Sequence, residues 1–146
     1  MIYKAKGGLY MRISTKGRYA LRLMVELARN FEKGTFTTIK SIAGSQEISE
    51  KYLEQIISIL HKSELVDSVR GPQGGYKLVK EPKEYSVGEI LRIVEGSIAP
   101  VYCVEECGEV CDKKEECATV FVWEKIKDAV DNVVDNITLQ DIIDRQ

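Results

Sequence analysis

Apolar side chains near the start of the chain recur at three- and four-residue spacing, which is the period of one face of a helix. They predict helices that begin near Thr15, near Thr38 and after Ser49, and Lys33-Gly34 is expected to end the first. The expected N-caps are Ser14 or Thr15 for the first helix, Thr37 or Thr38 for the second, and Ser49 for the third. The three stripes consist of Ala20, Leu23, Met24, Leu27, Ala28 and Phe31; Ile39, Ile42 and Ala43; and Leu53, Ile56, Ile57 and Leu60.

Two short runs rich in β-forming residues, 65–70 and 76–79, flank the turn sequence Gly71-Pro72-Gln73-Gly74-Gly75. This pattern predicts an antiparallel hairpin. Three short helices followed by a glycine-rich hairpin is the element order of a winged helix-turn-helix. We therefore predict a mainly α fold with a small β-hairpin wing, in which residues 11–82 form a DNA-binding domain.

The second half predicts a connecting helix within 83–97, where Ser86 and Glu89 are spaced as a capping box and Gly96 ends the helix. A long C-terminal dimerisation helix with a tail is expected over 118–146. Its stripe needs a second apolar surface, which a partner copy would supply in a homodimer; folding back on its own domain is the alternative. The stripe consists of Trp123, Ile126, Val130, Val134 and Ile137, and we expect Leu139, Ile142 and Ile143 to continue it after a bend at Thr138.

Charge is divided unequally along the chain. Residues 1–80 hold 14 Lys+Arg and 7 Asp+Glu, a net charge of +7, whereas residues 81–146 hold 7 and 16, a net charge of −9. Such a division suits a protein that touches a polyanion at one end only. The sequence contains neither an 18-residue apolar span nor a secretory signal, so we expect a cytoplasmic protein. Residues 1–10 are expected to be a disordered basic arm or to precede a true start at Met11.

Candidate DNA contacts lie at the start of the third helix and on the hairpin. Gln55 can pair with adenine and Glu54 can accept from cytosine N4, while Arg70 at the wing tip could enter the minor groove. The alternative is that Tyr52 is half-buried packing, that the polar residues are only solvated, and that the glycines make an ordinary turn. The full candidate set is Lys16, Arg18, Ser49, Tyr52, Glu54, Gln55, Arg70, Gly74, Gly75 and Lys77.

All four cysteines lie in one polar segment, which we expect to form a sensor loop over 98–117. Cysteines clustered in a cytosolic protein commonly bind zinc or an iron-sulfur cluster, or form a redox pair. The sequence shows no set of nucleophile, base and orienting residue, so we do not expect an enzyme. A small electron carrier or zinc protein remains as a different class, and it would leave the basic wing unexplained.

From Met11 onward the chain resembles the bacterial IscR/NsrR/CymR (Rrf-type) family of winged-helix transcription regulators. The resemblance rests on Ser14-Thr15-Lys16-Gly17-Arg18-Tyr19-Ala20, on Ile48-Ser49 with Tyr52-Leu53-Glu54-Gln55, on Val69-Arg70-Gly71-Pro72 with Gly74-Gly75-Tyr76, and on Cys111, Cys117, Thr119 and Trp123. It implies a homodimer on a pseudo-palindromic double-stranded DNA operator, and an iron-sulfur cluster held by Cys103, Cys111 and Cys117, with Cys107 as an extra ligand or a resolving thiol.

Two positions depart from the family pattern. The turn after the third helix reads Ser63-Glu64-Leu65 where glycine is usual, and Val120 stands where IscR-like proteins have a further histidine ligand. The only histidine, His61, lies far away in the sequence. An all-cysteine site, a carboxylate or an external ligand would have to complete a cluster. The resemblance therefore also allows a cluster-free, CymR-like regulator that answers to a thiol switch or a partner enzyme.

Overall fold

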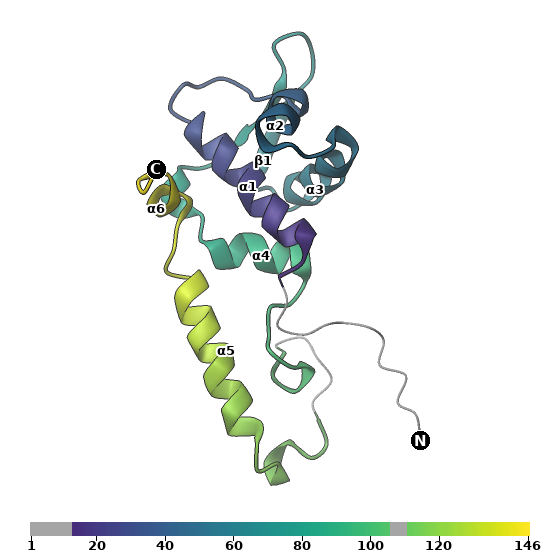
Figure 1. Ribbon diagram of the computed structural model, residues 1–146, viewed down its shortest axis with the longest axis vertical. Coiled ribbons are helices and arrows are strands. Elements are labelled where there is room, and N and C mark those ends of the chain that lie inside the picture. The colour runs from purple at the N-terminus through teal and green to yellow at the C-terminus, as the bar shows by residue number, and fades with distance from the viewer. Residues whose placement is uncertain (1–12, 106–110) are drawn as a thin grey trace.

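The computed structural model describes residues 13–105 and 111–146. Three helices, α1 (Thr15–Arg29), α2 (Ile39–Gln46) and α3 (Glu50–Lys62), precede a hairpin of β1 (Val66–Val69) and β2 (Gly75–Leu78), as Figure 1 shows. The predicted fold class, mainly α with a β-hairpin wing, is thus confirmed. Residues 1–12 and 106–110, which include the predicted N-terminal arm and Cys107, lie outside the described residues.

The predicted caps begin the three helices. The hydroxyl groups of Ser14, Thr38 and Ser49 accept hydrogen bonds from backbone N–H groups three residues further on. The apolar stripes meet in one core, in which Leu23, Ile42 and Leu53 are each fully buried. Because this core lies on one face of α3, the opposite face of that helix is left to solvent. Helix α1 ends at Arg29, earlier than expected, and a turn leads to Gly34 at φ 64°.

The turn after α3 shows how the chain manages without the usual glycine. Glu64 itself adopts the left-handed conformation at φ 59°. Its N–H donates to the His61 carbonyl and the Leu65 N–H donates to the Leu60 carbonyl, each at 3.0 Å. This is the Schellman pattern of a helix end, made with an L-residue at the position that favours glycine.

Helix α4 (Val87–Glu95) follows a short 3-10 turn, η1 (Pro82–Glu84), and Gly96 ends it at φ 82°. Only half of the predicted capping box is present. The Ser86 hydroxyl accepts from the Glu89 N–H at 3.0 Å, but the Glu89 carboxylate lies 3.4 Å from the Lys80 ammonium group. The Lys80 ammonium group, which follows β2, attracts this carboxylate away from the start of α4. The predicted second bond of the capping box, from the Ser86 N–H to the Glu89 carboxylate, is therefore wrong.

The C-terminal stripe is divided between two helices, α5 (Val120–Val134) and α6 (Leu139–Ile143). Figure 1 shows α5 as a separate rod, while α6 returns to the side of α1. Leu139 is fully buried, and Ile142 and Ile143 pack against the core. The predicted bend at Thr138 is confirmed, but the expectation that these residues continue the α5 stripe is wrong, because they bury themselves in their own domain.

Two short 3-10 turns, η2 (Tyr102–Val104) and η3 (Lys114–Glu116), lie in the segment that links α4 to α5. Of these, η2 lies beside α5, and η3 leads into that helix at the end furthest from the winged-helix domain (Figure 1). Within residues 13–105 and 111–146, no helix is long and apolar enough to cross a membrane.

Candidate nucleic-acid interface and cysteine segment

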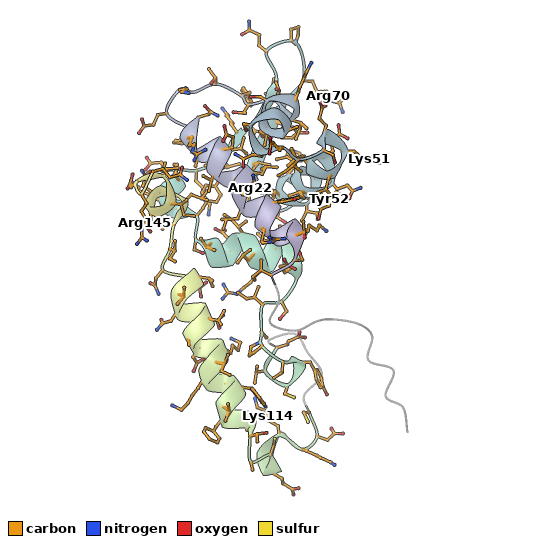
Figure 2. All side chains as sticks on the ribbon, in the orientation of Figure 1. Arg22, Lys51, Tyr52, Arg70, Lys114 and Arg145 are labelled. Carbon is orange, nitrogen blue, oxygen red and sulfur yellow. The ribbon has the colours of Figure 1, made fainter. Side chains whose placement is uncertain are left out.

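The start of α3 presents polar side chains away from the core. Ser49, Glu54 and Gln55 are exposed, while Leu53 is fully buried beneath them. Lys51 is exposed in the same first turn, and Figure 2 shows it beside Tyr52 on the side of the domain that also carries Arg70. Our list of candidate contacts omitted Lys51, although a cation within the first turn of the predicted recognition helix was a signal for it.

Tyr52 differs from its exposed neighbours because its side chain is half-buried. Its ring packs edge-on against Tyr19 of α1, with the ring centres 5.7 Å apart, and the Arg22 guanidinium lies 5.6 Å from the Tyr19 ring centre. Arg22 also donates to the side chain and the backbone carbonyl of Gln46, at 2.9 and 3.0 Å. These contacts fix the α2–α3 turn and the start of α3 on α1, so Tyr52 has a packing role whatever else it contacts.

The hairpin carries one exposed cation at its tip. Arg70 has no hydrogen-bond or ion-pair partner within residues 13–105 and 111–146. The local backbone explains why position 75 is a glycine. Tyr76 and Thr37 exchange two backbone hydrogen bonds of 2.8 Å, and a Cβ on Gly75 would lie 2.6 Å from the Thr37 oxygen. A Cβ on Gly74 would likewise meet the backbone carbonyl of Val69.

The three other cations of the candidate set, Lys16, Arg18 and Lys77, are the candidates for phosphate contacts, and they have different surroundings. Lys77 is half-buried, with its ammonium group 4.7 Å from the centre of the Phe36 ring. Arg18 is exposed and donates to the Thr15 hydroxyl at 3.1 Å, and Lys16 is half-buried. These two residues lie in the first turn of α1, where backbone N–H groups attract anions.

The N-terminus of α1 already faces an internal carboxylate. Glu95, at the end of α4, accepts hydrogen bonds from the Ser14 N–H and the Ser14 hydroxyl at 2.9 and 2.6 Å. Any phosphate contact at this end therefore depends on the Lys16 and Arg18 side chains, not on the helix terminus.

The described cysteines are free thiols: Cys103 and Cys111 are half-buried and Cys117 is exposed. Cys117 lies just before α5, with its sulfur 3.5 Å from the Thr119 hydroxyl, and this hydrogen bond lowers the pKa of the Cys117 thiol. Thiolates suit a soft metal centre. Within the described part of the chain, however, no three His, Cys, Asp or Glu side chains are gathered as a metal site. Cysteine thiolates are suitable ligands for an iron-sulfur cluster, but the described cysteines do not lie together as a binding site for one.

An ion-pair network joins α4 to the end of α5. The Arg92 guanidinium donates to Asp135 at 2.5 and 3.2 Å and to Asp131 at 2.6 Å, and the Lys127 ammonium group lies 2.6 Å from Asp131. The hydrogen bond to Asp135 raises the pKa of Arg92 most strongly. Burial opposes ionisation of Asp131, but Lys127 and Arg92 outweigh it and lower the pKa of the Asp131 carboxyl. The four-residue spacing of the two aspartates was the only sign of this network in the sequence.

The fold, with an exposed recognition helix beside a wing, defines a winged-helix DNA-binding transcription regulator. Comparison with known proteins agrees. Residues 13–145 match the Rrf2 family, described as an iron-dependent transcriptional regulator, and the chain belongs to this family.

The transcriptional regulator CymR of Bacillus subtilis is 46% identical over 132 residues, covering 90% of this chain and 89% of CymR. IscR of Escherichia coli is 38% identical over 136 residues, covering 93% of this chain and 82% of IscR. The structure of B. subtilis CymR, described as the global cysteine regulator, has a TM-score of 0.76 and 42% identity, covering 92% of this chain and 98% of that one.

Proposed function

We propose that the chain is a homodimeric, sequence-specific repressor that binds a pseudo-palindromic operator in the cytoplasm and whose DNA affinity depends on the cysteine segment. One observation carries the DNA-reading part. The start of α3 exposes Glu54 and Gln55, while the apolar face of the same helix is buried in the core. Figure 2 shows Lys51 and Tyr52, from the same helix start, on the side that carries Arg70. Donors and acceptors arranged in this way suit base edges in the major groove.

The α5 helix supports the proposed dimer. None of its residues is buried within the single chain, and Phe121 and Val133 are 57% and 58% exposed. The stripe of Trp123, Ile126, Val130 and Val134 is only half-buried, and Ile137 is exposed. A continuous apolar helix face of this kind gains free energy when a second helix covers it. A second copy of α5 is the proposed cover, and it would place two reading heads on one operator.

Ile126→Asp tests the dimer, because it places a charge in the middle of the stripe. We expect sedimentation to show a monomer at concentrations where the wild-type protein is a dimer. Asn132→Asp adds the same charge at an exposed α5 position and should remain dimeric. A wild-type monomer, or a dimer unaffected by Ile126→Asp, would refute this interface.

Arg70→Ala tests the DNA interface. Loss of one groove contact should weaken operator binding by about 1 to 3 kcal/mol, which is roughly fivefold to 150-fold. Arg145→Ala removes the same charge from the opposite side of the domain in Figure 2 and should leave binding unchanged. Affinities are compared at several salt concentrations, because phosphate contacts make them salt-dependent. Equal losses in the two variants would assign the effect to net charge.

For the sensor, Cys103, Cys111 and Cys117 are the residues that would hold an iron-sulfur cluster. Cys107, which lies outside the described residues, would be a further ligand or a resolving thiol. A bound cluster would supply a centre that oxygen, nitric oxide or iron shortage can alter. The free thiols and the lowered pKa of Cys117 support this assignment, because thiolate is the form that ligates a metal. The segment enters α5 directly, so a change in its conformation reaches the proposed dimer helix.

A cluster-free thiol switch or a partner enzyme is the second candidate. It is favoured by the absence of a gathered metal site among the described residues and by the similarity to CymR. Protein purified without oxygen separates the two candidates by its visible spectrum and its iron and sulfide content. A brown protein whose stoichiometric iron and sulfide disappear in Cys111→Ala or Cys117→Ala supports the cluster. A colourless, metal-free protein supports the thiol switch or partner, and stoichiometric zinc would overturn both.

A further inference from the structure

Tyr85, between η1 and α4, is fully buried, and its hydroxyl group uses its whole hydrogen-bonding capacity. It donates to the Leu65 carbonyl at 2.7 Å and accepts from the Val79 and Lys80 N–H groups at 3.0 and 3.1 Å. Leu65 precedes β1, and Val79 and Lys80 follow β2. One side chain therefore holds both strands of the wing at their root.

The backbone around Tyr85 is bonded to a different part of the molecule. The Leu139 N–H donates to the Tyr85 carbonyl at 3.1 Å, and the Val87 N–H donates to the Ile137 carbonyl at 2.8 Å. These bonds flank an antiparallel bridge between Ser86 and Thr138, at the bend that joins α5 to α6. Residue 85 thus touches the wing root with its side chain and the end of the α5 arm with its backbone.

The ion pairs of Arg92 add a second attachment on the same side. Asp135, one of its partners, lies two residues before Ile137, so α4 holds the end of α5 just before the bridge does. Two backbone hydrogen bonds beside the buried side chains of Tyr85 and Leu139 leave little freedom between the joined parts. A rotation of α5 at this end would be passed to the Ser86–Thr138 bridge and from there to the residue that holds the wing root.

The geometry points to Tyr85 as a positioning residue for DNA binding, which ties the wing root to the end of α5 so that the orientation of α5 sets the position of Arg70. This inference rests on the proposed function, in which Arg70 contacts DNA and α5 forms the dimer. It gives that function a route by which a change beside α5 reaches the wing.

Tyr85→Phe tests the inference, because it removes the hydroxyl and keeps the buried ring. Val25→Ala, a truncation in the α1 core that leaves the three hydrogen bonds of the Tyr85 hydroxyl in place, serves as the control for lowered stability. Operator affinity and hydrogen exchange are measured for the intact dimers at a temperature where each is folded. Arg70→Ala is combined with both backgrounds in a double-mutant cycle.

We expect Tyr85→Phe to lower operator affinity by about tenfold, the equivalent of one lost contact, and to reduce the effect of Arg70→Ala. Exchange should become faster both at residues 76–81 and at residues 136–140. In Val25→Ala the full effect of Arg70→Ala should remain. Unchanged affinity with an unchanged Arg70 effect would overturn the positioning role, and faster exchange confined to residues 76–81 would overturn the link to α5.

The two proposals fail in different ways. A wild-type protein without operator affinity, or without sensitivity to Arg70→Ala, would refute the proposed DNA interface. Hydrogen exchange needs no DNA, so it would still decide whether the Tyr85 hydroxyl connects the wing root to the α5–α6 bend.

Discussion

Glu64 offers a direct test of how the chain ends its recognition helix. It occupies the left-handed conformation at φ 59°, and its side chain is exposed. This conformation costs an L-residue about 1 to 2 kcal/mol. Glycine avoids that cost but loses more backbone entropy on folding, by roughly 0.5 to 1 kcal/mol. The variant Glu64→Gly should therefore be more stable than the wild-type protein by about 0.5 to 1 kcal/mol, or roughly 2 to 3 °C in Tm for a chain of this size.

Urea unfolding at one fixed protomer concentration measures this difference, because dimerisation makes stability depend on concentration. Glu64→Ala is the matched control. It removes the carboxylate from the C-terminal end of α3, where a negative charge is unfavourable, but keeps a Cβ. The hydrogen bonds around the turn involve only backbone atoms and should persist in both variants. If Glu64→Gly is no more stable than Glu64→Ala, backbone strain is not the cause and the reasoning is refuted.

Further predictions concern the α4–α5 junction, the wing root and the hairpin. Arg92→Ala removes three hydrogen bonds to carboxylates and should lower stability at pH 7 by about 1 kcal/mol, after allowance for solvent screening. Because the folded-state pKa of Asp131 is lowered, this contribution is present above its unfolded pKa of about 4 and is lost as the pH falls through the folded value; urea unfolding at pH 7 and pH 3 should show the difference shrinking. Burial raises the pKa of Tyr85, so the contribution of its neutral hydroxyl group to folding stability is present below about pH 10 and is lost as the pH rises through the folded-state pKa. Unfolding curves between pH 8 and 11 should show this alkaline loss of stability in the wild-type protein and not in Tyr85→Phe. Gly75→Ala should destabilise the fold by about 2 kcal/mol, because the residue has φ 145° and its Cβ would meet the Thr37 backbone, and a Tm equal to the wild-type value would contradict that contact.

The sequence predicted the parts of this protein that depend on neighbours a few residues apart. The caps Ser14, Thr38 and Ser49 each bond to a backbone N–H three residues on, and the stripes of α1 to α3 are set by helical period alone. The hairpin followed from its glycine-rich turn. These signals are local, so the winged-helix order and the outward face of the recognition helix could be read before the structure was known.

The candidate site could be predicted only in part. The exposed positions Glu54, Gln55 and Arg70 follow from the helix period and the turn, and the structure leaves all three at the surface. The helix period alone does not place the half-buried Tyr52, because its packing depends on Tyr19, 33 positions earlier in the chain. For the cysteines, spacing identified the segment, but it did not determine which thiols come together.

Only the tertiary structure decided which surface covers each apolar stripe. Leu139 was expected to continue the α5 stripe but fills its own domain's core, because the chain bends at Thr138 and α6 packs against α1. The Glu89 carboxylate is drawn from its expected cap to Lys80, and Tyr85 bonds to Leu65, 20 residues earlier, and to Leu139. A periodic pattern records that a residue must be buried or paired, whereas the partner is chosen by free energies that arise only when distant segments meet.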